Sequence, residues 1–136
     1  MSAAGARAAA GAAVRLLGGA TAVVRVPSPP LANADAEELG MPAPEFHDLV
    51  ITPCAVRTLS NGDQLLLADA ATLEAALGVQ GDAAAQSTLQ GAAFVQVNGA
   101  ALLLRGVDAR SFAGRAYLYR LLLRTADAER EAEATP

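Results

Sequence analysis

Short apolar segments with alternating or β-branched residues recur along the chain, and each is bounded by Gly, Pro or an Asn-Gly pair. Segments of this length and composition are typical of strands. A proline within one of them, Pro53, indicates an edge position or a bulge, because proline cannot donate to a β-ladder. The fold class predicted is mainly β, a small antiparallel β-barrel or sandwich. The expected strands are Thr21–Val26, Leu49–Leu59, Gln64–Leu67, Phe94–Val97, Ala100–Val107 and Arg115–Thr125.

The pair Asn98-Gly99 between two apolar segments is the strongest local signal, because it accepts the positive φ angles of a type I′ turn. A tight hairpin is expected there, and a turn around Phe112 to Gly114 leads into the last strand. Strict alternation divides that strand into two faces. One face carries Tyr117, Tyr119, Leu121 and Leu123, and the other carries Ala116, Leu118, Arg120, Leu122 and Arg124.

Two segments are predicted to be helical. The Ala-rich segment Ala3–Leu17 has high helix propensity and is followed by two glycines. A short internal helix over Ala70–Leu77 follows an Asp cap and ends at a glycine, with Glu74 exposed. The segment Gly81–Gly91 is interpreted as a connector of small residues.

A chain of 136 residues fits one domain. Residues 1–18 form the N-terminal helix, residues 19–125 the β-barrel domain, and residues 126–136 a polar tail expected to be flexible. Within the domain, residues 31–48 form a long early loop with two prolines and five acidic residues but no Arg. Long loops of this kind are usually functional or disordered.

Composition narrows the classes of partner. The chain has a net charge of −4 and ten arginines that are not grouped into a block, which disfavours direct binding of nucleic acid. Arg15 interrupts the apolar stretch that a signal peptide would need, and no segment approaches the roughly 18 apolar residues of a membrane span. We therefore expect a soluble, unexported protein with no membrane contact.

Candidate chemistry is sparse. The only His and the only Cys, His47 and Cys54, form a conceivable nucleophile and base, but a surface histidine and a buried thiol explain them more simply. Glu37, Glu38, Glu45 and Asp48 offer oxygen ligands for a divalent cation, yet their spacing matches no calcium loop. Phosphate-binding glycine motifs are absent from the sequence. We expect no enzyme activity, and no catalytic, cofactor-binding or metal site.

Charge is distributed unevenly along the sequence, with acids early and arginines late. This polarity either belongs to a solvated surface or marks contacts in which the acidic loop of one subunit meets the basic strands of another. The candidate subunit-contact or channel loop residues are Asp35, Glu37, Glu38, Glu45, Phe46 and Asp48. The candidate basic contact face consists of Arg105, Arg110, Arg115, Arg120 and Arg124.

The order of segments carries a family resemblance. A helix leads into TAVVRVPSPP, a loop with EELGMPAPEF follows, then HDLVITPCAVR, and finally VNGAALLLRGVDARSFAGRAYLYRLLLR. Over about Gly19 to Arg124 this order resembles the neck proteins of tailed bacteriophages, the head-closure or head-tail joining family. The helix Ala3–Leu17 departs from the pattern, because many such proteins begin near the first strand, and we interpret it as a docking element.

The resemblance implies a virion structural protein located in the neck and made in the bacterial cytoplasm. Subunits of that family form a ring between the portal or its adaptor and the tail proteins, and packaged DNA only passes through the channel. No cofactor is implied. Two alternatives stay open: a cellular β-barrel module that binds a protein or ligand, and, more remotely, a Cys/His-dependent enzyme.

Overall fold

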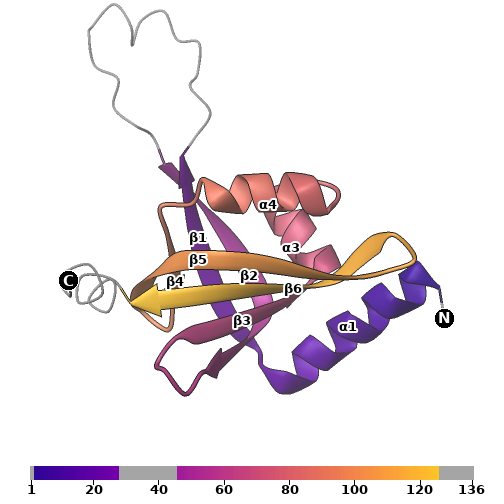
Figure 1. Ribbon diagram of the computed structural model, residues 1–136, viewed down its shortest axis with the longest axis horizontal. Helices are drawn as coiled ribbons and strands as arrows, with labels where there is room; N and C mark the ends of the chain where they lie inside the picture. Colours follow the sequence, from indigo (N-terminus) through magenta and orange to yellow (C-terminus); the bar gives the residue numbers. More distant parts are fainter. Residues whose placement is uncertain (1, 28–45, 126–136) are drawn as a thin grey trace, which may run out of the picture.

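The computed structural model of the chain describes residues 2–27 and 46–125 (Figure 1). Six strands form a closed barrel in the order β1-β2-β3-β6-β5-β4, and β4 returns to pair with β1. Every neighbouring pair is antiparallel. The predicted mainly β fold is confirmed, as a barrel. The elements are α1 (Ala3–Leu17), β1 (Ala20–Pro27), β2 (Phe46–Thr58), β3 (Gln64–Asp69), α3 (Ala70–Leu77), α4 (Asp82–Gln90), β4 (Phe94–Val97), β5 (Ala100–Phe112) and β6 (Arg115–Thr125).

Alternating residues of the strands fill the barrel, as period-two patterning requires. In β1, for example, Ala22, Val24 and Val26 are buried, while Arg25 between them is exposed. Helices α3 and α4 contribute to the same core through Leu73 and Leu89, among others. The barrel interior and the two short helices therefore form one hydrophobic core.

Strand β2 is long because it serves two neighbours. Its first part pairs with β1 and its second part with β3. Between them the register shifts: Ala22 pairs with Ile51 but Ala20 pairs with Cys54, so β2 contains one additional residue at this point. Pro53 lies in that interval, which confirms the bulge that its position in the sequence suggested.

Strand β6 corrects the predicted division of its faces. Tyr119, Leu121 and Leu123 are fully buried in the core, as expected. Leu118 pairs with Arg110, and Ala116 pairs with Ser111. Tyr117 is therefore an extra residue of β6 with no residue opposite it in β5. This bulge reverses the alternation, so that Ala116 points into the core and Tyr117 lies on the outside. The sequence pattern had placed both residues on the wrong face.

Two elements and the burial of one residue also differ from expectation. Gly81–Gly91 is mostly helix α4 rather than a connector, because Ala85 and Leu89 lie one turn apart and both bury against the core. Strand β2 begins at Phe46, so residues 46–48 belong to the barrel and not to a loop. Glu74 is buried, not exposed, since α1 packs beside α3. Residues 28–45 and 126–136, which hold the rest of the expected loop and the tail, lie outside the described residues.

Helix α1 packs against the outside of the barrel, over β2, β3 and β6, and also contacts α3 (Figure 1). Ser2 caps it, since the side-chain oxygen accepts a hydrogen bond from the Gly5 N–H at 3.0 Å. Ala6 and Val14 are buried under the helix. At its end the backbone of Gly18 approaches β2 so closely that a Cβ atom there would lie 2.4 Å from the Cys54 carbonyl oxygen.

Gly11 in α1 and Gly18 at its C-cap both face the barrel, and we expect their substitution by alanine to change stability by different amounts. Gly18→Ala requires a shift of the β2 backbone, and we expect it to lower the free energy of unfolding by about 1–3 kcal/mol. A Cβ at Gly11 meets its nearest atom, Asp69 Oδ2, at an ordinary 3.5 Å. Gly11→Ala should therefore be neutral or stabilise the protein by up to about 1 kcal/mol through helix propensity. Urea unfolding of both variants measures the difference, and equal effects would contradict this account of α1 docking.

Candidate functional site

One outer face of the barrel combines exposed apolar side chains with an ion pair. On β2, Phe46 and Val50 are 48% and 51% exposed. Asp48, between them on the same face, accepts a hydrogen bond from the Arg25 Nε at 2.9 Å. The Arg25 guanidinium also lies 5.1 Å from the centroid of the Phe94 ring of β4. We call this surface, formed by Phe46, Asp48, Val50, Arg25 and Phe94, the Phe46 face.

The ion pair favours the charged forms of both Asp48 and Arg25 on the Phe46 face. The hydrogen bond from Arg25 holds the pKa of Asp48 below its usual range, and the same bond raises the pKa of Arg25. Both side chains are 44% exposed, so the pair contributes little to stability. Its effect is to fix two polar groups beside the apolar side chains of β2, which pairs with β1 along this stretch.

The predicted acidic set is only partly described by the structure. Asp35, Glu37, Glu38 and Glu45 lie outside the described residues. Phe46 and Asp48 are strand residues on the barrel surface, because β2 extends its pairing with β1 as far as Pro27. Asp48 meets Arg25 of its own chain, a contact that the sequence pattern did not indicate.

The predicted basic residues are spread along the β5–β6 hairpin and partly neutralised. Arg120 pairs with Asp108, its cross-strand partner, and Arg110 Nε lies 4.0 Å from the same carboxylate. Arg124 donates two hydrogen bonds, of 3.2 and 3.3 Å, to Asp63. Hydrogen bonds from Arg120 and Arg124 lower the pKa of Asp108 and Asp63, respectively. Arg105 and Arg115 are exposed residues of the same hairpin.

A buried ion pair that sequence reasoning missed ties α1 to the barrel. Arg7 Nη1 lies 3.1 Å from Glu74 Oε2 and donates a second hydrogen bond to the Ala116 carbonyl at 2.7 Å. The other Glu74 oxygen accepts from the Gly81 N–H at 3.0 Å. Only 16% and 9% of the two side chains are exposed. No sequence signal connects residues so far apart, because the contact depends on where α1 docks.

Arg7 and Glu74 also line a polar cleft of about 760 Å³ with Asp82, Ser111 and Arg115. Tyr119 is buried near these charges, and burial raises its pKa to about 12. Within the described residues its hydroxyl has no hydrogen-bond partner. The phenol therefore stays protonated at neutral pH. Tyr119 belongs to the hydrophobic core and does not line the cleft. In the cleft itself, Arg7 and Glu74 are paired with each other.

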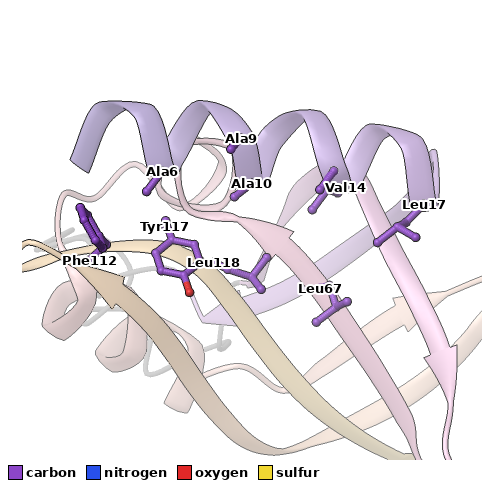
Figure 2. A pocket seen from close by; sticks show the side chains of 10 residues that line it. Ala6, Ala9, Ala10, Val14, Leu17, Leu67, Phe112, Tyr117 and Leu118 are labelled. Carbon is purple, nitrogen blue, oxygen red and sulfur yellow. The ribbon is translucent and has the colours of Figure 1, made fainter. Parts of the chain in front are cut away.

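An apolar groove of about 410 Å³ lies between α1 and the β5–β6 hairpin (Figure 2). Alanines on the barrel side of α1 are too short to fill the space below the helix. Phe112 and Leu17, which Figure 2 shows toward the two ends of the groove, are 40% and 71% exposed. Tyr117 reaches the groove because of the β6 bulge. The lining residues are Ala6, Ala9, Ala10, Ala13, Val14, Leu17, Leu67, Phe112, Tyr117 and Leu118.

His47 and Cys54 do not form a nucleophile–base pair within the chain. They lie seven residues apart on one strand, which at about 3.3 Å per residue separates them by roughly 20 Å. Cys54 is fully buried, and burial raises the pKa of its thiol. Among the described residues no three potential ligands gather as a metal site would require. None of the helices within these residues has the length and apolar character needed to cross a membrane.

The Arg7–Glu74 pair predicts a strong energetic coupling. Glu74→Gln can still accept from Gly81 but leaves the Arg7 charge without its partner, and we expect a loss of about 2–4 kcal/mol in the free energy of unfolding. Arg7→Met combined with Glu74→Gln should cost less than the sum of the two single changes, because neither buried charge is then left alone. A double-mutant cycle by urea unfolding measures this coupling, and additive effects would contradict the pairing.

The Asp63–Arg124 pair predicts a dependence of stability on pH. Because Arg124 lowers the pKa of Asp63 in the folded state, the ionised carboxylate stabilises the protein above its unfolded pKa of about 3.9. That contribution is lost as the pH falls through the lower folded pKa. Asp63→Asn should therefore be less stable than the unmodified chain at pH 7, and the difference should shrink toward pH 3. Thermal unfolding across this range tests it.

Asp48→Asn provides the matched control for this pH dependence. Its pKa is also lowered by an arginine, but Asp48 is 44% exposed whereas Asp63 is 5% exposed as a residue. We expect a clearly smaller change in the thermal midpoint for Asp48→Asn than for Asp63→Asn. The reverse order would show that the Asp63 pair does not stabilise the end of β6.

Comparison of the chain with protein-family models, with curated proteins and with solved structures returned no match.

Proposed function

We propose that this protein is a structural component of the bacteriophage neck, a head-closure or head-tail connector that assembles as a ring between the portal or adaptor and the tail. The observation that carries the proposal is the combination of a closed six-stranded barrel with an insertion of residues 28–45 between its first two strands. This is the arrangement implied by the resemblance of the segments from TAVVRVPSPP to AYLYRLLLR.

Exposed apolar side chains on more than one surface support an assembly role. Phe46 and Val50 lie on the Phe46 face, and Leu17 and Phe112 lie at the groove. Large exposed apolar residues that gather on a small protein indicate protein–protein contacts. Contacts on separate surfaces suit a subunit that has several neighbours at once.

The charge of the chain supports a channel through which DNA moves. Its net charge is −4, and its sequence between the first two strands carries acids but no arginine. Like charge prevents a phosphate backbone from adhering to the wall of a channel. In the proposed ring, packaged DNA passes without being bound.

A cellular β-barrel module that binds a small apolar ligand is the second candidate. The apolar groove favours it, because about 410 Å³ falls within the range of ligand sites. The groove is lined by alanines and other apolar residues and contains few polar groups to orient a ligand. For that reason we rank this function below assembly.

The test begins with the genes on both sides of this one. Neighbours that encode portal, terminase, capsid and tail-tube proteins are expected, followed by detection of the protein in purified particles and a ring at the neck in electron micrographs. Disruption of the gene should give DNA-filled heads that leak DNA and carry no tails. Metabolic neighbours, or particles with normal tails after disruption, would reject the neck function and favour the ligand-binding module.

A further inference from the structure

We propose that α1 is a hinged arm that leaves the surface of the barrel as a unit while the barrel stays folded. The hinge is the connection Gly18–Gly19, and the latch is the ion pair between Arg7 and Glu74. Opening of the arm exposes the surface of β3 and β6 that α1 covers in the closed state. The inference goes beyond the proposed function and does not depend on it.

The hydrophobic core does not include α1. Within the described part of the chain, the strands, α3 and α4 supply the residues of the core. The ladder of the barrel is likewise complete without the helix, since strands pair only with strands. Figure 1 accordingly shows α1 lying on the outside of the barrel. Departure of the helix therefore removes no side chain from the core and breaks no strand pairing.

The contact between α1 and the barrel buries little apolar surface. The buried residues of α1 are Ala6, Gly11 and Val14, and only Val14 has a side chain larger than a methyl group. Beside them, the groove of about 410 Å³ leaves part of the helix without close contacts to the barrel. Because hydrophobic stabilisation scales with the apolar area removed from water, apolar contacts stabilise the docked helix only weakly.

The polar contact of α1 lies far from the hinge. At about 1.5 Å per residue, Arg7 is roughly 16 Å from Gly18 along the helix. There Arg7 Nη1 lies 3.1 Å from Glu74 Oε2 and 2.7 Å from the Ala116 carbonyl oxygen. A contact at this distance from the hinge closes the arm, because its loss frees the length of helix between the two points.

Release of the latch leaves neither charge buried without a partner. Arg7 and Glu74 both line the polar cleft of about 760 Å³, so water can reach them when they separate. Glu74 Oε1 also keeps the hydrogen bond from the Gly81 N–H, which does not involve α1. Because the hydration regained on separation offsets much of the attraction within a buried pair, the closed arm is only moderately favoured.

The connection between α1 and β1 suits a hinge. Gly19 has a φ of +89°, which favours glycine, and a Cβ atom there would have no neighbour within 4 Å. Gly18, in contrast, packs against the backbone of β2 and marks the point about which the helix turns. Hinges are a few residues at the ends of elements that absorb large changes in backbone dihedral angles. Rotation at these two glycines moves α1 and leaves β1, which begins at Ala20, in the ladder.

Hydrogen exchange of the full chain tests the arm directly. The amides at the centre of α1, residues 9–14, should share one protection factor at least about tenfold lower than that of the slowest β6 amides. Their exchange should also depend less on urea, because undocking exposes less surface than unfolding. Arg7→Met should lower their protection at least about tenfold, whereas Arg15→Met, a change at an exposed arginine of α1, should lower it less than about threefold. Equal protection and urea dependence of α1 and β6, fraying from the helix ends alone, or equal effects of the two substitutions would overturn the proposal.

Limited digestion with trypsin tests the latch from the side of the barrel. Cleavage after Arg7 requires that its side chain leave Glu74 and that the helix open, so its rate follows the undocked population. Glu74→Gln should raise this rate at least about tenfold, because the buried arginine loses its charged partner. Asp82→Asn is the matched control and should change the rate less than about threefold, since Asp82 lines the same cleft but accepts a hydrogen bond from Gln86. Equal rates in the two variants, or cleavage after Arg7 that never precedes cleavage within the barrel strands, would reject the latched arm.

Discussion

Closure of the barrel by β4 is the constraint on which the rest of the structure depends. This strand of four residues pairs with β1 on one side and β5 on the other. Without it, β1 and β5 would each present an unpaired edge, and the core would open beside Val95 and Val97. Closure also fixes Phe94 under Arg25, so the arrangement of the Phe46 face follows from the same short strand.

Closure in turn limits how the protein can associate. Within the described residues β1 is paired on both sides, and the longest stretches that pair with a strand on one side alone are the first part of β2 and the part of β5 beyond Leu102, so most of the accessible surface consists of side chains on the outside of the barrel. The outer surface is not uniform, because the β6 bulge brings Tyr117 out to the groove and the Pro53 bulge bends β2 from β1 toward β3. Irregularities in the ladder thus shape the surfaces available for partners.

Local signals in the sequence predict most of the fold. Asn98-Gly99 marks the β4–β5 turn, Pro53 marks a bulge, and alanine content marks α1. The bulge at Tyr117 has no such marker, since Arg115–Thr125 alternates without a glycine or proline, and the face assignment was therefore wrong for its first residues. Helix α4 was missed because a short segment of Ala, Gln, Ser and Thr is stabilised as a helix mainly by burial of Ala85 and Leu89.

The candidate surfaces were less predictable because they depend on contacts distant in sequence. The sequence pointed to Phe46 and Asp48 but assigned them to a loop, and it gave no indication that Asp48 meets Arg25 or that Asp63 meets Arg124. The groove exists only because α1 docks on β3 and β6, held in part by Arg7 and Glu74. The order of charged residues along the chain does not predict these ion pairs, because it does not show which elements pack against each other.

The close approach of Gly18 to β2 has a mechanical consequence. Only Gly18 and Gly19 separate α1 from β1, and Gly18 is pressed against the backbone of Cys54 and Ala55. Because the connection is only two residues long, a displacement of α1 has to be taken up by Gly18, Gly19 or β1. Strand β1 ends at Pro27, opposite Phe46. The groove under α1 and the surface at Phe46 are thus connected through one short linker and one strand, so a partner that displaces α1 also acts on the strand that pairs with the start of β2.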